Sequence, residues 1–226
     1  MIILHMKNEK PIPLSVQTRG IILGSLLGDG SLKIHEGYSN ARFSFRHSII
    51  QKEYFYWKAH SLKEISGNSS VFHQKPDGFS SNEKLRFQSR ALPSLTEIYM
   101  VTHKNKSFQI KRKWLNRMTP LSLAIWWFDD GSIISNGRKG VFSTDGFDKK
   151  SVQILSKYLR VVWNISTTVA PVSRKQGGKQ EQYWRLWIRS SEEMKKFLRI
   201  VVPYTPVKEL LPKILLLYSD PIIQQR

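Results

Sequence analysis

Two stretches of the chain share one pattern of apolar and polar positions. Each is an apolar run with helical character that ends in an acid and a glycine, IILGSLLGDG at 21–30 and SLAIWWFDDG at 122–131. The matching acids, Asp29 and Asp130, lie 101 residues apart. Because self-similarity at a fixed spacing is the mark of a repeated architecture, the pattern predicts two copies of one unit.

The residues after each stretch repeat as well. Arg86 and Arg90 are matched 99 residues later by Arg185 and Arg189, and Phe43-Ser44 by Phe142-Ser143 at the same spacing. Helical patterns at 49–65 and 152–164 also correspond. Each unit reads as helix, strands, helix, strand or strands, and helix. We therefore predict a tandem duplication, with repeats at 16–103 and 119–218 joined by a basic linker at 104–118 that has no regular period.

Local signals set the ends of the helices. The first helix should begin near Val16 and end at Gly30, a residue suited to the left-handed C′ position. Thr119 and Pro120 are good N-cap and first-turn residues for its counterpart. A closing amphipathic helix is expected at 208–218, interrupted near Pro212.

Strand segments alternate apolar and polar positions, most clearly at 42–46, 84–88 and 183–189. A hairpin loop is expected at 173–180. The positions that point away from the core include no acid: Arg42, Ser44, Arg46, Lys84, Arg86, Gln88, Arg90, Tyr183, Arg185, Trp187 and Arg189. Arginine and glutamine side chains can contact base edges, and a curved sheet fits the DNA major groove. We assign these residues, with Lys33, Arg138 and Lys139, to DNA binding; the alternative is a solvated basic face.

Composition supports a polyanionic partner. The 226 residues include 36 Lys and Arg against 17 Asp and Glu, a formal net charge of +19. Nucleic acid is the favoured partner; anionic membranes and solubility alone are the alternatives. No apolar run reaches the ~20 residues of a membrane span, and residues 1–6 are too short for a signal-peptide core. We therefore expect no membrane partner.

The residue inventory excludes several chemistries. The absence of Cys excludes disulfides and thiolate metal sites. The sequence contains neither a Gly-x-Ser-x-Gly elbow nor a phosphate-binding P-loop, and its six His residues show no metal-ligand spacing. Trp126, Trp127 and Phe128 are assigned to core packing.

Asp29 and Asp130 occupy the ends of their helices where a carboxylate is disfavoured by roughly 0.3–1 kcal/mol, and Asp129 adds to this cost. A divalent cation would relieve the conflict, because carboxylates and helix-end carbonyls are hard ligands for Mg²⁺. Gly24 and Gly28 lie on one helix face and would let the two helices approach closely, bringing both acids together. Turn chemistry of the Asp-Gly pairs is the alternative explanation.

Both stretches resemble the LAGLIDADG motif, and the chain resembles single-chain LAGLIDADG homing endonucleases from about Val16 to Leu217. Gly24, Asp29 and Gly30 match the third, eighth and ninth motif positions in the first copy. The matches in the second copy are Leu123, Ala124, Asp130 and Gly131. Ile125 departs from the motif glycine, so the helix pair is expected to pack asymmetrically there.

The resemblance implies an α+β monomer of two αββαββα halves, with saddle-shaped antiparallel sheets and the motif helices at the centre. It implies Mg²⁺-dependent cleavage of both strands of a long, nearly palindromic DNA site, with Mn²⁺ as a substitute and Ca²⁺ able to bind without cleavage. Asp29 and Asp130 would carry the metal, helped by the main-chain carbonyls of Gly28 and Asp129. A basic residue beside each scissile phosphate would be Lys106 and Lys208, with Lys104 and Lys213 as alternatives.

Two other functions stay open at this point. Some relatives of this family act as RNA-binding intron maturases, which would make the host intron RNA a partner, and a DNA-binding protein without cleavage is also possible. Family habit places such proteins in a mitochondrion, a chloroplast or a microbial cytoplasm.

Overall fold

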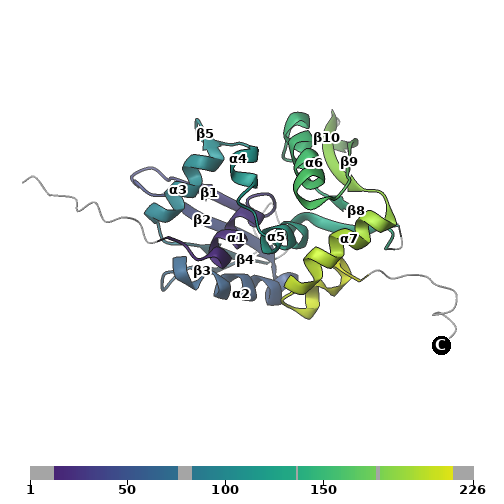
Figure 1. Ribbon diagram of the computed structural model, residues 1–226. Coiled ribbons are helices and arrows are strands. Elements are labelled where there is room, and N and C mark those ends of the chain that lie inside the picture. The colour runs from purple at the N-terminus through teal and green to yellow at the C-terminus, as the bar shows by residue number, and fades with distance from the viewer. Residues whose placement is uncertain (1–12, 76–82, 136, 177–178, 216–226) are drawn as a thin grey trace, which may run out of the picture.

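The computed structural model describes residues 13–75, 83–135, 137–176 and 179–215. They form two αββαββα halves, as expected (Figure 1). The first half contains α1 (Val16–Ser25), β1 (Gly30–Lys33), β2 (Arg42–Ser48), α2 (Lys52–Ser61), β3 (Val71–Gln74), β4 (Lys84–Gln88) and α3 (Pro93–Thr102). The second contains α5 (Pro120–Asp130), β7 (Gly131–Ile134), β8 (Lys139–Phe142), α6 (Lys149–Trp163), β9 (Thr168–Gln176), β10 (Lys179–Ile188) and α7 (Ser191–Val201).

The two sheets have the same topology. Their strand orders are β1-β2-β4-β3 and β7-β8-β10-β9, and every pairing is antiparallel. Short 3₁₀ helices extend the α-helices: η1 (Ile49–Gln51) and η2 (Lys63–Ile65) flank α2, while η3 (Val202–Tyr204) and η4 (Lys208–Lys213) follow α7. The α+β duplication is therefore confirmed strand by strand.

The segment between the halves is more regular than expected. It contains a small hairpin of β5 (His103–Lys104) and β6 (Ser107–Phe108), followed by the one-turn helix α4 (Arg112–Leu115). The left-handed residues Asn105 and Lys106 make the hairpin turn, with φ of 51° and 62°. The residue boundaries 16–103, 104–118 and 119–218 stay a prediction.

Helices α1 and α5 pack side by side at the centre of the molecule (Figure 1). Their approach depends on missing side chains: a Cβ atom on Gly24 would lie 2.3 Å from the carbonyl oxygen of Ser122 and 2.9 Å from the Cβ of Ile125. Real Cβ atoms do not come this close to their neighbours, so a glycine is required at position 24. Ile125 therefore packs against a glycine, which is the asymmetric contact that its departure from the motif suggested.

The two motif helices begin and end differently. Thr119 caps α5 as predicted, in a capping box with Ser122, and Pro120 is the first helical residue. The expectation for Gly30 was wrong, because α1 ends at Ser25 and tight turns lead to Asp29. Positive φ among the described glycines occurs at Gly37 and Gly137. Gly30 instead begins β1, where a Cβ would lie 2.7 Å from the Cβ of Ser25.

The core lies between the helices and one face of each sheet. In the first half the stacked rings of Phe45 and Phe87 meet Phe55 of α2. In the second half Trp126 stacks on Phe142, with ring centroids 4.1 Å apart. Trp126, Trp127 and Phe128 are fully buried, as expected for core residues.

The end of the second half differs in detail from the prediction. Strands β9 and β10 continue into the expected 173–180 loop, so that Arg174 pairs with Glu181. The closing helix is the 3₁₀ helix η4, and Pro212 lies within it; residues 216–218 of the predicted element lie outside the described residues. Within the described part of the chain, the helices are too short or too polar to span a bilayer.

Candidate metal centre and nucleic-acid interface

Asp130 is the last residue of α5, and Asp29 lies in the turns after α1 rather than at the helix end, close enough for its charge to act on Asp130. Burial raises the pKa of Asp130 from 3.8 to about 7, and the nearby charges of Asp29 and Asp129 add to this rise. Burial and the charge of Asp129 raise the pKa of Asp29 to about 6. Burial is the largest cause for both acids, so each carboxyl group favours its neutral form or a nearby cation.

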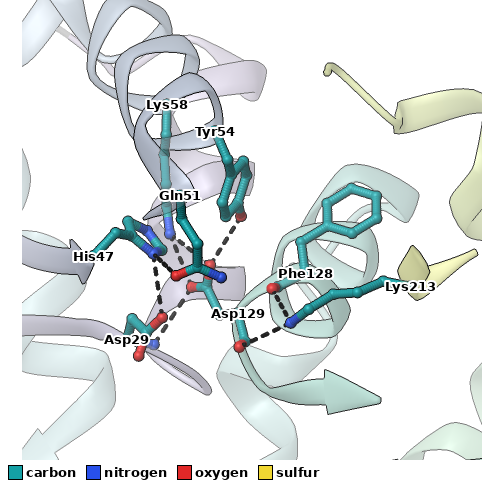
Figure 2. A network of polar contacts seen from close by, with 8 residues as sticks. All are labelled: Asp29, His47, Gln51, Tyr54, Lys58, Phe128, Asp129 and Lys213. Carbon is teal, nitrogen blue, oxygen red and sulfur yellow. Dashed lines mark hydrogen bonds and ion pairs between the residues drawn. The ribbon is translucent and has the colours of Figure 1, made fainter. Parts of the chain in front are cut away.

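The carboxylate of Asp129 lies beside Asp29 and points toward α2 of the first half (Figure 2). Lys58 on α2 donates to both of its oxygens, at 2.9 and 2.8 Å, and Tyr54 donates its hydroxyl at 2.8 Å. The main-chain N–H of Asp29 also donates to it, at 3.4 Å. The side chains of Lys58 and Asp129 are both 0% exposed, so this ion pair is fully desolvated.

His47 adds a neutral ring beside Asp29. Its Nδ1 lies 3.5 Å from a carboxylate oxygen of Asp29 and 3.4 Å from the amide oxygen of Gln51 (Figure 2). Burial, with the charge of Lys58, lowers the pKa of His47 to about 4. One potential ligand atom from each of Asp29, His47 and Asp129 lies within 4.8 Å of the others.

Sequence reasoning missed the place of His47. Its signal was the period-two series Phe43, Phe45, His47, which puts the ring on the core face of β2. The buried Lys58 was missed as well, because it is one of 36 lysines and arginines and its charge does not set it apart.

Lys213 approaches the acids from the second half. Lys213, at the end of η4, donates to the main-chain oxygens of Phe128 and, at 3.3 Å, Asp129. Its own carbonyl accepts the indole N–H of Trp127 at 2.7 Å, which fixes its backbone. Burial lowers the pKa of Lys213, although the three acids oppose this change.

Lys106 lies in the β5–β6 turn and lines a cavity of about 490 Å³ together with Gly28, Gly30, His103 and Asp130. Lys208, by contrast, is exposed at the start of η4. In the described part of the chain, no hydrogen bond or ion pair joins Lys208 to the acids. Lys213 contacts the main chain of Asp129 and Lys106 lines the cavity that contains Asp130, whereas Lys58 pairs with the Asp129 carboxylate itself.

The residues at this centre suit a hard divalent cation. Asp29 keeps 38% of its side chain exposed, and Asp130 is half-buried at the rim of the cavity. Carboxylate and carbonyl oxygens are the ligands that Mg²⁺ and Mn²⁺ prefer. Burial raises the pKa of both acids, and a cation at this centre would offset the cost of ionising them there.

The exposed face of the first sheet carries the predicted basic residues in register. Arg46 lies opposite Arg86, Ser44 opposite Gln88, and Lys33 opposite Arg42. Residues directly opposite each other point to the same side of a sheet, so these side chains, with Lys84, share one face. Arg90 lies beyond the end of β4 and donates to the main-chain oxygen of Glu64 at 3.3 Å.

The second sheet differs in its charge. Tyr183, Arg185 and Trp187 alternate along β10 as predicted, and Arg138 and Lys139 are exposed at the β7–β8 connection. Arg185, however, makes a bidentate ion pair with Asp145, at 2.7 and 2.6 Å. Its charge is therefore partly neutralised by an acid that the strand pattern could not reveal. Arg189 lies beyond β10 with its guanidinium 5.7 Å from the ring centre of Trp187.

Fold and site together define a two-repeat α+β protein with an acidic centre between two curved sheets. Residues 19–197 match the LAGLIDADG DNA endonuclease family. The chain belongs to this family.

Three known proteins show the range of its relatives. The cytochrome b mRNA maturase bI2 of Saccharomyces cerevisiae is 30% identical over 220 residues, which are 90% of this chain and 50% of the maturase. The DNA endonuclease I-ChuI of Chlamydomonas applanata is 23% identical over 73% of this chain and 81% of its own. The solved structure of the homing endonuclease I-WcaI bound to its DNA recognition sequence has a TM-score of 0.74, at 21% identity over 90% of this chain and 88% of I-WcaI. The chain thus spans about half the length of the yeast maturase.

Proposed function

We propose that this protein is a monomeric, site-specific endonuclease that hydrolyses both strands of a long, pseudo-palindromic DNA site with Mg²⁺ or Mn²⁺. The convergence of Asp29 and Asp130 from the two repeats carries this proposal. Lys213 contacts the main chain of Asp129, Lys106 lines the cavity that contains Asp130, and the exposed face of the first sheet is basic. The match to I-WcaI, solved with its DNA recognition sequence, supports DNA as the partner.

The chain's own groups divide the work at the centre. Asp29 and Asp130, with the main-chain oxygens of Gly28 and Asp129, would hold the divalent ions. Such ions polarise a phosphoryl oxygen, lower the pKa of bound water and stabilise the leaving oxygen. Lys213 and Lys106 supply positive charge on either side, where it would orient water and stabilise charge that develops on the phosphate. The two sheets would bind the flanking DNA and fix its register.

Substitution of the acids tests this proposal directly. Asp29→Asn and Asp130→Asn should each reduce Mg²⁺-dependent cleavage of a plasmid carrying the cognate site by at least about 100-fold. Binding to the same DNA should stay within about threefold of the wild type, because the sheets are unchanged. Glu97→Gln, on the exposed surface of α3, is the matched control and should cleave normally. Cleavage at the wild-type rate by either Asn variant would overturn the assignment.

A second candidate function is assistance of intron splicing. The yeast bI2 maturase, which matches over 90% of this chain, favours it. The helical layer also carries an exposed basic set around α4 and α6: Lys111, Lys113, Arg117, Lys150, Lys157 and Arg160. Among the described residues, none of these six side chains has a carboxylate within ion-pair distance. RNA binding to this set would leave the sheets free for DNA.

Competition separates the two functions. Host intron RNA should bind the protein with submicromolar affinity, and a Lys157→Glu/Arg160→Glu variant should lose that binding while cleaving DNA normally. If the variant still binds the RNA, or if RNA and DNA compete equally for the sheets, this surface is excluded as an RNA site. We place the protein in an organelle with its own genome, or in a microbial cytoplasm, and localisation of a tagged copy tests this.

A further inference from the structure

The two repeats differ at the position just before the metal-binding acid. The first repeat has Gly28 there, and the second has Asp129. The two residues meet across the helix pair, since a Cβ on Gly28 would lie 2.4 Å from the Cβ of Asp129 and 3.1 Å from one of its carboxylate oxygens. The glycine therefore makes the space through which the Asp129 side chain enters the first repeat.

Among the described residues, every hydrogen-bond donor to that carboxylate comes from the first repeat. Lys58 contacts both oxygens and Tyr54 contacts one, and both residues lie one helical turn apart on α2. The ring centre of Phe45 lies 4.7 Å from the Lys58 nitrogen, so the pair is closed over by aromatic surface. An ion pair with no exposed surface is held firmly, because separating it would leave a charge buried alone.

The second repeat in turn holds α2 in place. A carboxylate oxygen of Glu209 in η4 accepts the main-chain N–H groups of Glu53 at 3.0 Å and Tyr54 at 3.3 Å, at the start of α2. The same η4 ends at Lys213, which donates to the main-chain oxygen of Asp129. A closed series of contacts therefore runs from the Asp129 side chain through α2 and η4 back to the Asp129 main chain.

We infer that Lys58 and Tyr54 are positioning residues that occupy both oxygens of the Asp129 carboxylate, which lies beside Asp29, so that Asp129 offers the cation only its main-chain oxygen. The inference rests on the proposed endonuclease site and deepens it. Without Lys58, the Asp129 carboxylate would be a third unpaired negative charge within reach of Asp29, whose N–H it already accepts. The centre would then bind cations more tightly and with less defined geometry.

A luminescence titration with Tb³⁺, a hard cation sensitised by the nearby tryptophans, tests the inference without cleavage. Lys58→Met should bind Tb³⁺ roughly tenfold more tightly than the wild type, because one more carboxylate becomes available to the ion. Lys63→Met, an exposed lysine just after α2, is the matched control and should leave the affinity unchanged. The double variant Lys58→Met/Asp129→Leu should return to the wild-type affinity.

Stability measurements separate positioning from folding alone. Lys58→Met should lower Tm by about 10 °C, and the double variant should recover most of this loss, because an apolar pair can replace a buried ion pair. If Lys58→Met does not fold, Tyr54→Phe removes one hydrogen bond only and should still raise Tb³⁺ affinity about twofold to threefold.

The two proposals fail in different ways. Tb³⁺ binding that Asp29→Asn does not weaken would overturn the metal centre itself. Binding that Asp29→Asn weakens but Lys58→Met leaves unchanged, or reduces, would overturn the positioning role alone. A purely structural role predicts the loss of Tm without the gain in cation affinity.

Discussion

A Cβ atom on Gly28 would lie 2.4 Å from the Cβ of Asp129, so the smallest residue of one repeat directly opposes an acid of the other. The two positions are equivalent in the duplicated sequence, yet they have become complementary in shape. Each of the two residues comes directly before a metal-binding acid of the proposed centre, Asp29 or Asp130.

A methyl group at position 28 should therefore disturb the centre. We expect Gly28→Ala to reduce the free energy of unfolding by roughly 1–3 kcal/mol, the usual cost of overpacking a close contact. Urea unfolding followed by tryptophan fluorescence measures the loss. Gly146→Ala is the control, because nothing lies within 4 Å of a Cβ there and no φ strain opposes it. Equal stability of the two variants would contradict the close approach of α1 and α5.

The raised pKa values of the acids predict how the metal-free protein responds to pH. The folded state holds protons on Asp29 and Asp130 up to about pH 6 and 7, whereas the unfolded chain releases them near pH 3.8. Their ionisation therefore opposes folding, and stability falls as pH rises through the folded pKa values. We expect Tm in the presence of EDTA to fall between pH 6.5 and 8.

Two comparisons check the origin of this pH dependence. His47, whose pKa is lowered to about 4, destabilises the fold only as pH falls below about 6.5, so it does not contribute in the chosen range. Asp130→Asn should flatten the curve, and Mg²⁺ should raise Tm most at pH 8, where the acids are ionised. A Tm that rises from pH 6.5 to 8 without metal would contradict the assignment.

The two sheets should contribute unequally to DNA binding. Arg86→Ala removes a cation that lies opposite Arg46 and has no acid partner among the described residues, so the dependence of log K on log salt should become shallower by about one. Arg185→Ala should change this slope less, because Asp145 already neutralises the guanidinium. Fluorescence anisotropy over a salt series gives both slopes. Equal slopes for the two variants would contradict the difference in charge.

Lys213 and Lys208 offer a second contrast. Lys213→Met should lower the rate of DNA cleavage by about 100-fold to 1,000-fold, because it removes the charge beside Asp129 and Asp130. Lys208→Met, only five residues earlier but exposed, should cleave at nearly the wild-type rate. Single-turnover cleavage at saturating protein measures both. If Lys208→Met is the impaired variant and Lys213→Met cleaves normally, Lys208 is the basic residue of the site and the role proposed for Lys213 is wrong.

Sequence patterns predicted much of this architecture, because repetition and strand alternation are local signals. The close approach at Gly24, the Thr119 cap and the outward basic residues of β2 and β4 all follow from spacing. Gly28, expected on the same helix face as Gly24, instead lies in the turns after α1. The contacts that give the centre its charge could not be predicted from spacing. Lys58 pairs with Asp129 across 71 residues, and Asp145 reaches Arg185 across 40.

One local signal for Lys58 was available. Tyr54, Phe55, Lys58 and Ala59 are the buried residues of α2, so the lysine falls within an apolar stripe of helical period. A charge in such a stripe needs a buried partner. The sequence does not show which of the 17 acids that partner is, because only the packing of α2 against the end of α5 decides it.

Because Gly28 of the first half contacts Asp129 of the second, each half needs the other to complete this site. Two copies of the first half would place Gly28 against Gly28 and leave each Lys58 buried with no counter-ion. Two copies of the second would place two Asp129 side chains against each other in one space. A symmetric dimer of either half would therefore lack the Lys58–Asp129 ion pair that joins the two repeats.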